Sequence, residues 1–236
     1  MTVTRLLMPA ARLVPGALEL PPAVAHHARV ARVEIGEAVE VLDLAGTVAV
    51  ARLIAWEGRS CRIEVERLER ERGEPPEALV LGLGILAGNV FDWAVEKATE
   101  LGATVIVPLL TERVQGRRHE ARVSRWRRVA QAAVAQCGRS RLPDVPAPVA
   151  LAPFCAAAGG ARLVAEPGSP GPVAPLVTGG SGLCVLVGPE GGLTESEIAL
   201  ALGAGFRRLS LGPRILRAET AALAALAAAQ QLAGWL

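Results

Sequence analysis

The sequence is poor in several residue types on which common functional sites depend. Tyrosine is absent, phenylalanine occurs three times, and Lys97 is the only lysine among 236 residues. Because a G-x-x-x-x-G-K-[ST] motif needs a lysine after its glycine, the chain has no phosphate loop of that kind. The scarcity of aromatic side chains also argues against a generic single-strand nucleic-acid binder, which stacks bases on such rings.

Cysteine and histidine are equally sparse. The four cysteines, Cys61, Cys137, Cys155 and Cys184, show no C-x-x-C spacing, which argues against a zinc site or a disulfide framework and suits a reducing cytosol. No H-x-x-x-H or G-x-S-x-G motif occurs, and the glycines at 82–88 lack the G-x-G-x-x-G spacing of a dinucleotide site. The sequence therefore supports neither hydrolase nor metal chemistry, and we expect no metal.

Targeting and membrane signals are also missing. Residues 1–15 lack the sustained apolar stretch of a secretory signal. The most apolar long stretch, 218–236, is mostly alanine and contains Gln230 and Gln231, so it is too polar to span a membrane. We expect a cytoplasmic protein with no membrane partner.

The first 70 residues have the pattern of a β-rich domain. Apolar residues alternate with polar or small ones at 39–41, 48–50 and 63–65, which is the period of half-buried strands. A short helix rich in histidine and arginine is expected at 26–33. The charged segment 68–76 ends in two prolines and is expected to be a linker.

A different pattern follows the linker. Apolar runs at 79–86, 104–109, 163–165 and 183–187 are typical of strands buried on both faces of a sheet. Helical patterns lie between them, one beginning near Asn89 and one at 124–138. Strands that alternate with helices predict an α/β fold with a parallel sheet.

Two glycine-marked loops near the end of the chain are the candidate site. The first, 188–192 (GPEGG), follows an apolar run, and Thr194 with Glu197 has the spacing of a helix capping box. The second, 211–213 (LGP), leads into the alanine-rich C-terminal segment. Glycine lets a backbone come close to a ligand, and parallel sheets bind ligands at the carboxyl ends of their strands.

The ionisable groups around these loops are few, namely Glu190, Arg214, Arg217 and Glu219. Main-chain hydrogen bonds with few charges suit a neutral or zwitterionic ligand and a reaction that depends on positioning and electrostatics. Methyl transfer from a sulfonium donor fits these residues, because the donor's own positive charge activates the methyl group.

Arginines dominate the middle of the chain. Nine of them lie between residues 113 and 141 against the single acid Glu120, whereas residues 1–72 hold ten arginines and ten acids. Arginine pairs with phosphate in a bidentate manner, so the imbalance favours a nucleic-acid contact over a solvated helix face.

The motifs at 188–194 (GPEGGLT) and 211–221 (LGPRILRAETA) closely resemble those of the RsmE family. These are bacterial methyltransferases of the SPOUT superfamily that form 3-methyluridine in small-subunit (16S) ribosomal RNA. Segments at 97–102, 108–113, 125–126 and 136–139 are similar to the middle motifs of the family. One departure is the segment 86–90 (LAGNV), where the family usually carries a lysine.

This resemblance implies a fold and a set of partners. The fold is a PUA-like β-barrel that binds RNA (1–72) joined to a SPOUT-type parallel α/β domain (73–236) with a C-terminal deep trefoil knot. The protein would be a homodimer that binds ribosomal RNA, either free or within the assembled subunit, and S-adenosyl-L-methionine. The cofactor contacts would be Leu186, Val187, Gly188, Gly191, Gly192, Leu211, Gly212, Leu216, Arg217 and Ala218, with a further loop near 165–166 closing over the cofactor.

Arg5 and the segment 26–32 resemble the RNA-binding domain of the family. They are therefore expected to contact RNA in addition to the central arginines. The expected RNA contacts are Arg5, Arg29, Arg32, Arg113, Arg117, Arg118, Arg122, Arg125 and Arg139. Expected in catalysis are Arg217, which stabilises charge on the uracil oxygens or orients the base, and Glu190. Either Glu190 or Glu219 takes the N3 proton, directly or through water. Glu219 has the position of a first-turn carboxylate that stabilises the last helix.

Two other functions remain open at this point. A related knotted enzyme methylates the ribose 2′-hydroxyl with the same cofactor loops, and a non-catalytic RNA-binding or ribosome-assembly protein would keep them as a relic. The position of the methyl group in the nucleoside product distinguishes a base methyltransferase from a 2′-O-methyltransferase. Binding of S-adenosylmethionine distinguishes an enzyme from a non-catalytic protein.

Overall fold

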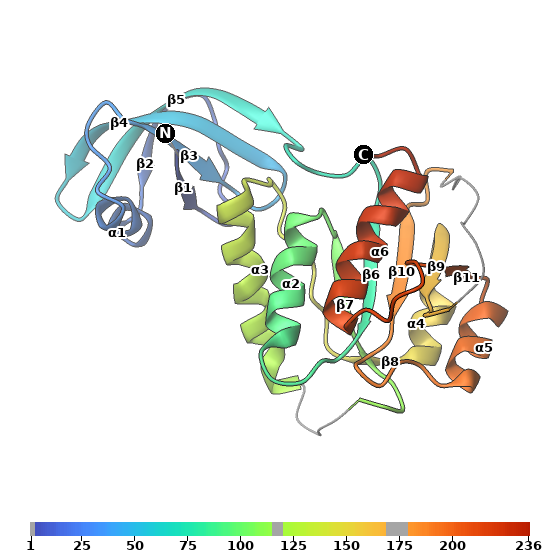
Figure 1. Cartoon of the computed structure of the whole chain (residues 1–236). Helices are drawn as coiled ribbons and strands as arrows, with labels where there is room; N and C mark the ends of the chain where they lie inside the picture. Colours follow the sequence, from blue (N-terminus) through green and yellow to red (C-terminus); the bar gives the residue numbers. More distant parts are fainter. Residues whose placement is uncertain (1–2, 115–119, 169–178) are drawn as a thin grey trace. The chain divides into compact units, whose positions relative to one another are not determined.

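The computed structural model describes residues 3–114, 120–168 and 179–236. The chain forms two compact units (Figure 1). The first groups residues 1–74 with 134–142, and the second groups 75–133 with 143–236.

The first unit contains a five-stranded sheet among its described residues, in the order β1-β3-β4-β5-β2. The strands are β1 (Thr4–Leu7), β2 (Gly16–Leu20), β3 (Ala38–Leu42), β4 (Thr47–Glu57) and β5 (Ser60–Arg70). All neighbours pair antiparallel except β1 and β3, which are parallel. On β5 the buried residues alternate with exposed ones at Cys61, Ile63 and Val65, which confirms the predicted period of two.

One helix, α1 (Pro22–Val30), buries Val24, Ala25 and Ala28 in the core of this unit. We predicted it at 26–33, four residues too late, because Pro22 takes the first helical position, where proline needs no amide hydrogen bond. The predicted linker is also shorter than expected, since β5 continues to Arg70.

Within its described residues, the second unit contains a sheet of six strands, all parallel, in the order β11-β9-β10-β6-β7-β8. The strands are β6 (Leu79–Gly84), β7 (Val105–Leu110), β8 (Val149–Ala150), β9 (Ala161–Ala165), β10 (Leu183–Val187) and β11 (Arg207–Leu209). The predicted parallel α/β architecture is therefore confirmed. The strand β10 comes late in the chain and yet lies between β9 and β6.

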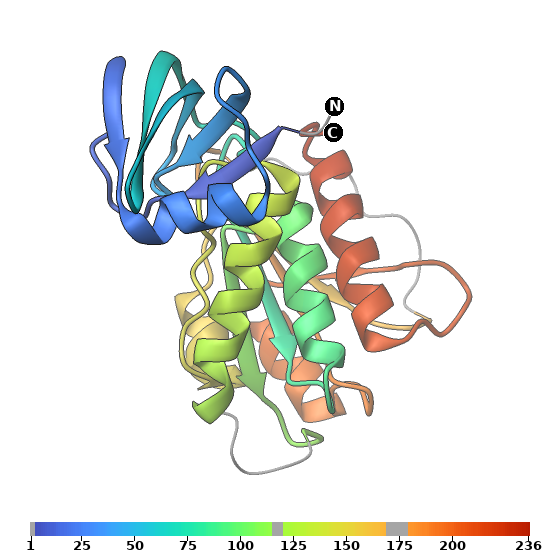
Figure 2. The same cartoon turned by 90° about the vertical axis from the view of Figure 1, so that its left-hand side faces the viewer.

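Helices cover both faces of this sheet. On one face α2 (Val90–Glu100) packs beside α6 (Ala218–Leu232), which also contacts β10 (Figures 1 and 2). The 3-10 turn η1 (Glu120–Arg122) precedes the helix α3 (Val123–Cys137). This helix contacts α2 through the rings of Trp126 and Phe91. On the other face α4 (Leu151–Ala157) and α5 (Glu195–Gly203) share a core with residues of β7, β9 and β10.

Sequence and packing explain where the strands of this sheet end. Every residue of β10 is buried, as expected for the centre of a parallel sheet. Beyond its last residue the chain turns through glycines and enters α5 at the capping box, where Thr194 Oγ1 accepts a hydrogen bond from the Glu197 amide. Helix α6 contains two glutamines, and no helix in the described residues is long and apolar enough to cross a membrane.

Candidate functional site

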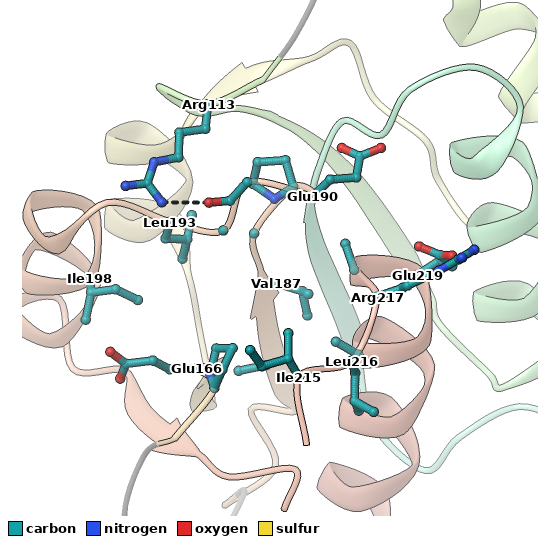
Figure 3. A pocket seen from close by; sticks show the side chains of 18 of the residues that line it. Arg113, Glu166, Val187, Glu190, Leu193, Ile198, Ile215, Leu216, Arg217 and Glu219 are labelled. Atoms are coloured by element: carbon teal, nitrogen blue, oxygen red, sulfur yellow. Dashed lines mark hydrogen bonds between the residues drawn. The ribbon is translucent and has the colours of Figure 1, made fainter. Parts of the chain in front are cut away.

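A cavity of about 780 Å³ lies where the carboxyl ends of β9 and β10 meet the start of α6 (Figure 3). Three segments form most of it: 165–167 after β9, 187–193 at and after β10, and 215–221 leading into α6. Val90, Arg113 and Ile198 complete the lining from α2, the segment after β7 and α5. The two glycine-marked loops predicted to form one site therefore do lie together.

The first loop is shaped by its own packing. A β-carbon added to Gly188 would lie 2.8 Å from the Leu193 amide nitrogen, and one added to Gly84 of β6 would lie 2.4 Å from the Pro189 nitrogen. Either side chain would push the loop away from the sheet. We expected these glycines to make room for a ligand, but at Gly188 the backbone that comes close belongs to the protein itself.

Arg113 forms part of the cavity wall. Its Nη1 donates a hydrogen bond to the Gly191 carbonyl oxygen at 2.6 Å (Figure 3). Its aliphatic stem lies against Gly191, where an added β-carbon would meet the Arg113 β-carbon at 3.2 Å. The segment after β7 thus holds the loop that follows β10. We predicted Arg113 as an RNA contact, and its place in this wall had no signal in the sequence.

Glu190 ties the same loop to the segment after β6. Its Oε1 accepts a hydrogen bond from the Ala87 amide at 2.7 Å, and the side chain is exposed. Held this way, Glu190 has one carboxylate oxygen committed to the backbone and the other available to a ligand or to water. The segment at 86–90, where a lysine is usual in the family it resembles, therefore contacts the loop through its backbone.

Arg217 and Glu219 lie across the cavity from Ile198 (Figure 3). Arg217 is the N-cap residue of α6, with an exposed side chain that makes no capping hydrogen bond. Glu219 lies in the first turn, where its charge favours the positive end of the helix. Ile215, 86% exposed, and Leu216 present apolar side chains to the same space.

Most of the predicted cofactor contacts line this cavity. Those that do are Val187, Gly188, Gly191, Gly192, Leu216, Arg217 and Ala218. Leu211 and Gly212 line a small cavity that shares Leu216 with the main one, and Leu186 is fully buried in β10. The loop at Glu166, which lines both cavities, is held by an ion pair with Arg208.

The predicted RNA contacts are more scattered. Arg122 and Arg125, near the start of α3, are exposed and reach the segment after β6, where they donate to the Gly88 carbonyl and the Asn89 Oδ1. In the first unit Arg32 is exposed, and Arg29 packs over the Trp56 ring at 4.6 Å. Arg117 and Arg118 lie outside the described residues.

Three of these arginines form ion pairs with acids of the chain, and one of them is Arg125, which pairs with Asp92 at 2.5 Å. Arg139 is 3% exposed and pairs with Glu74 at 2.6 Å, so its guanidinium does not face solvent. Arg5 pairs with Glu40 at 3.0 Å and donates to the Gln136 carbonyl. The local excess of arginine overstated the free positive charge, because acids distant in sequence neutralise part of it.

Comparison with known proteins identifies the family. Residues 73–230 match the model of the RNA methyltransferase domain. The chain is 34% identical over 231 residues to the ribosomal RNA small subunit methyltransferase E of Synechocystis, covering 94% of this chain and 76% of that one. This chain is a member of the RsmE family.

Further relatives agree with this assignment. The RsmE protein of Mycobacterium tuberculosis is 32% identical over 216 residues, which cover 86% of this chain and 81% of that protein. A crystal structure of RsmE from Neisseria gonorrhoeae, bound to S-adenosyl methionine, superposes with a TM-score of 0.87 at 30% identity and covers 98% of both chains. The match to the RNA methyltransferase domain, over residues 73–230, includes every segment that lines the cavity.

Proposed function

We propose that this RsmE-family chain is an S-adenosyl-L-methionine-dependent methyltransferase that methylates N3 of a specific uridine in small-subunit (16S) ribosomal RNA. The observation that carries the proposal is the cavity at the ends of β9 and β10, built from the loops that the family motifs mark. The relative from Neisseria gonorrhoeae, similar over 98% of this chain, binds the cofactor.

The residues present fit S-adenosylmethionine. A volume of about 780 Å³ lies within the range of small-molecule sites, roughly 300–1,000 Å³. Val187, Ile215 and Leu216 offer apolar surface for the adenine, while the acid Glu166 suits a positive group of the cofactor. We propose that the predicted cofactor contacts, including Leu211 and Gly212, hold the ligand there.

Bound in this way, the cofactor supplies a methyl group that its positive sulfur activates for transfer. The protein has to orient the uracil ring and to handle the proton at N3. Arg217, which stays protonated, stabilises negative charge on the uracil oxygens. Glu190, whose second oxygen is available beside the cavity, takes the proton directly or through one water.

The finer architecture belongs to the same proposal. Residues 1–72 would form a PUA-like β-barrel that binds RNA, and 73–236 a SPOUT domain with a C-terminal deep trefoil knot. The five-stranded sheet of the first unit and the late placement of β10 between β9 and β6 are consistent with these folds. The protein would act in the cytoplasm as a homodimer.

For RNA we propose contacts from the arginines whose side chains are exposed, namely Arg29, Arg32, Arg113, Arg122 and Arg125, together with Arg117 and Arg118. Arg5 and Arg139 would support the contacts of the first unit from within, given their pairing with Glu40 and Glu74.

The test uses small-subunit ribosomal RNA from a strain that lacks this protein, both free and within the subunit. The purified full chain with S-adenosylmethionine should restore one methyl group at N3 of a uridine, identified by mass spectrometry of the nucleosides. A methyl group on the ribose would instead indicate a 2′-O-methyltransferase. Absence of cofactor binding by calorimetry would point to a non-catalytic protein.

A further inference from the structure

A second cavity of about 450 Å³ opens beside the first. It is lined by Asn89, Val90 and Trp93 from the start of α2 and by Arg217, Glu219 and Thr220 from the start of α6. Val90, Arg217 and Glu219 line both cavities, so the two spaces share one wall. A group that enters the second cavity faces the first across these three residues.

An acceptor of the methyl group must occupy a space that adjoins the donor. The small cavity at Leu211 and Gly212 also adjoins the main one, but its volume of about 30 Å³ has room for roughly one or two waters. Of these two spaces beside the main cavity, the one at Trp93 therefore has room for an acceptor base.

Trp93 gives this compartment an aromatic wall. The chain has seven aromatic residues, and Trp93, at 42% exposed, is the most exposed of them. Its neighbours on α2, Phe91 and Ala94, are fully buried, so the helix is anchored while the indole remains at the surface. An exposed indole offers a flat apolar face, and unstacked bases stack on such faces.

The polar lining complements a base edge. Asn89 Oδ1 accepts a hydrogen bond from Arg125 Nη2 at 3.1 Å, so the nitrogen of the same amide is the end that can donate to a base oxygen. Thr220 adds a hydroxyl, and Arg217 adds a fixed positive charge at the shared wall. A pyrimidine with two carbonyl oxygens beside an acidic N–H matches these groups.

We propose that the acceptor uracil, turned out of the RNA, stacks on Trp93 in this second cavity and presents N3 past the Arg217 side chain to the methyl group held in the first, so that the N3–carbon bond forms as the carbon–sulfur bond breaks. This inference rests on the proposed function. It places the acceptor base in the second cavity, while the cofactor binds in the main cavity. Trp93 is the stacking platform that positions the base. A methyl acceptor held on the indole lies beside the residue that stabilises its developing charge.

The experiment compares Trp93→Ala, Trp93→Leu and Trp93→Phe with the unchanged full chain. Methylation of unmodified small-subunit RNA is measured as kcat/KM, cofactor affinity by calorimetry, and oligomeric state by sedimentation. Loss of the aromatic face in the Ala and Leu variants should lower kcat/KM by roughly 5- to 100-fold, the range expected for one base stack. The Phe variant should stay within about threefold of the original, and cofactor affinity within about twofold.

Leu200→Ala is the matched control, since Leu200 lies on α5 with a similar exposure of 40% and lines neither cavity. Its kcat/KM should not change. The Leu variant keeps an apolar side chain in place, so it remains informative if the Ala variant fails to fold.

Two results would overturn the inference alone: full activity in the Leu variant, or activity lost together with a change in oligomeric state. The second would make Trp93 a contact between two copies of the chain. An unchanged chain that binds the cofactor but methylates no small-subunit RNA would instead overturn the proposed function, and this inference with it.

Discussion

Arg217 is one of the three residues that line both cavities, together with Val90 and Glu219. A guanidinium does not release its proton near neutral pH, so it contributes a fixed positive charge. Its position at the N-cap of α6 adds the positive end of the helix to that charge. Together they favour negative charge at the shared wall, which is where a uracil anion would develop.

Removing this charge should slow methyl transfer more than it weakens cofactor binding. For Arg217→Ala we expect kcat to fall by about 10²–10³, as for the loss of one preorganised donor to a developing anion. Single-turnover methylation measures the first quantity and calorimetry with S-adenosylmethionine the second. An equal loss of both would assign Arg217 to cofactor binding. Arg207→Ala, on exposed β11 outside both cavities, is the control.

The sequence revealed the residues of the site that lie within the two glycine loops, because each loop is a continuous motif. It did not reveal Val90, Trp93 or the wall position of Arg113. These residues belong to α2 and to the segment after β7, about 70 to 130 positions from the loops that they approach. Local patterns carry no information on such distances, so the wall is visible only in the folded chain.

Among the elements, α5 has the best defined start. The Glu197 carboxylate accepts hydrogen bonds from the amides of Thr194 and Glu112, at 2.9 Å each. One side chain thus joins the loop after β10 to the segment after β7. The capping box was readable from sequence, whereas its link to Glu112 was not.

Thr194→Ala should lower the free energy of unfolding by about 1 kcal/mol, because the Glu197 amide loses its side-chain acceptor. Thr194→Ser retains an oxygen at that position and should stay within a few tenths of a kcal/mol. Urea unfolding of both variants measures the difference. Equal stability of the two would show that the hydroxyl contributes nothing to the cap.

Elements with a long or strongly apolar pattern were predicted correctly, as β10 and α3 illustrate. The segment 149–157, which forms β8 and α4, was not predicted. A strand of two residues has no period to detect, and α4 has only seven residues. β8 forms because it pairs with the edge of β7. α4 forms because it covers apolar residues on one face of the sheet.

On the scale of a whole unit, Glu40 joins segments that are far apart in the sequence. Arg72 donates to both oxygens of its carboxylate, at 2.7 and 2.8 Å, and Arg5 pairs with it at 3.0 Å. Arg5 and Arg72 in turn donate to the carbonyls of Gln136 and Gly138. The network connects β1, β3 and the end of β5 with residues 134–142, which are separated from them by more than 60 positions.

These contacts lower the pKa of Glu40 below its ordinary value of 4.5, mainly through the hydrogen bonds from Arg72. A carboxyl whose pKa is lowered by folding stabilises the protein above its unfolded pKa, and this stabilisation is lost as the pH falls through the folded pKa. Glu40→Gln should therefore cost about 1–3 kcal/mol at pH 7, and less as the pH drops below about 4.5.

Urea unfolding at pH 7 and at pH 3 tests this expectation. Glu66→Gln is the matched control, because Glu66 pairs with Arg52 in an exposed position and should contribute little at either pH. A cost for Glu40→Gln that does not vary with pH would rule out the charged form as its source.

The position of β10 also sets an order of assembly. The ribosome synthesises β6 and β9 before β10, yet β10 must enter between them. Until residues 183–187 emerge, β6 and β9 each keep an open edge, and open parallel edges invite wrong pairing. Direct pairing of β6 with β9 would leave β10 without its place in the sheet. Productive folding of this unit therefore requires residues 183–187 to compete with β9 for the edge of β6, and this competition begins only after they have been synthesised.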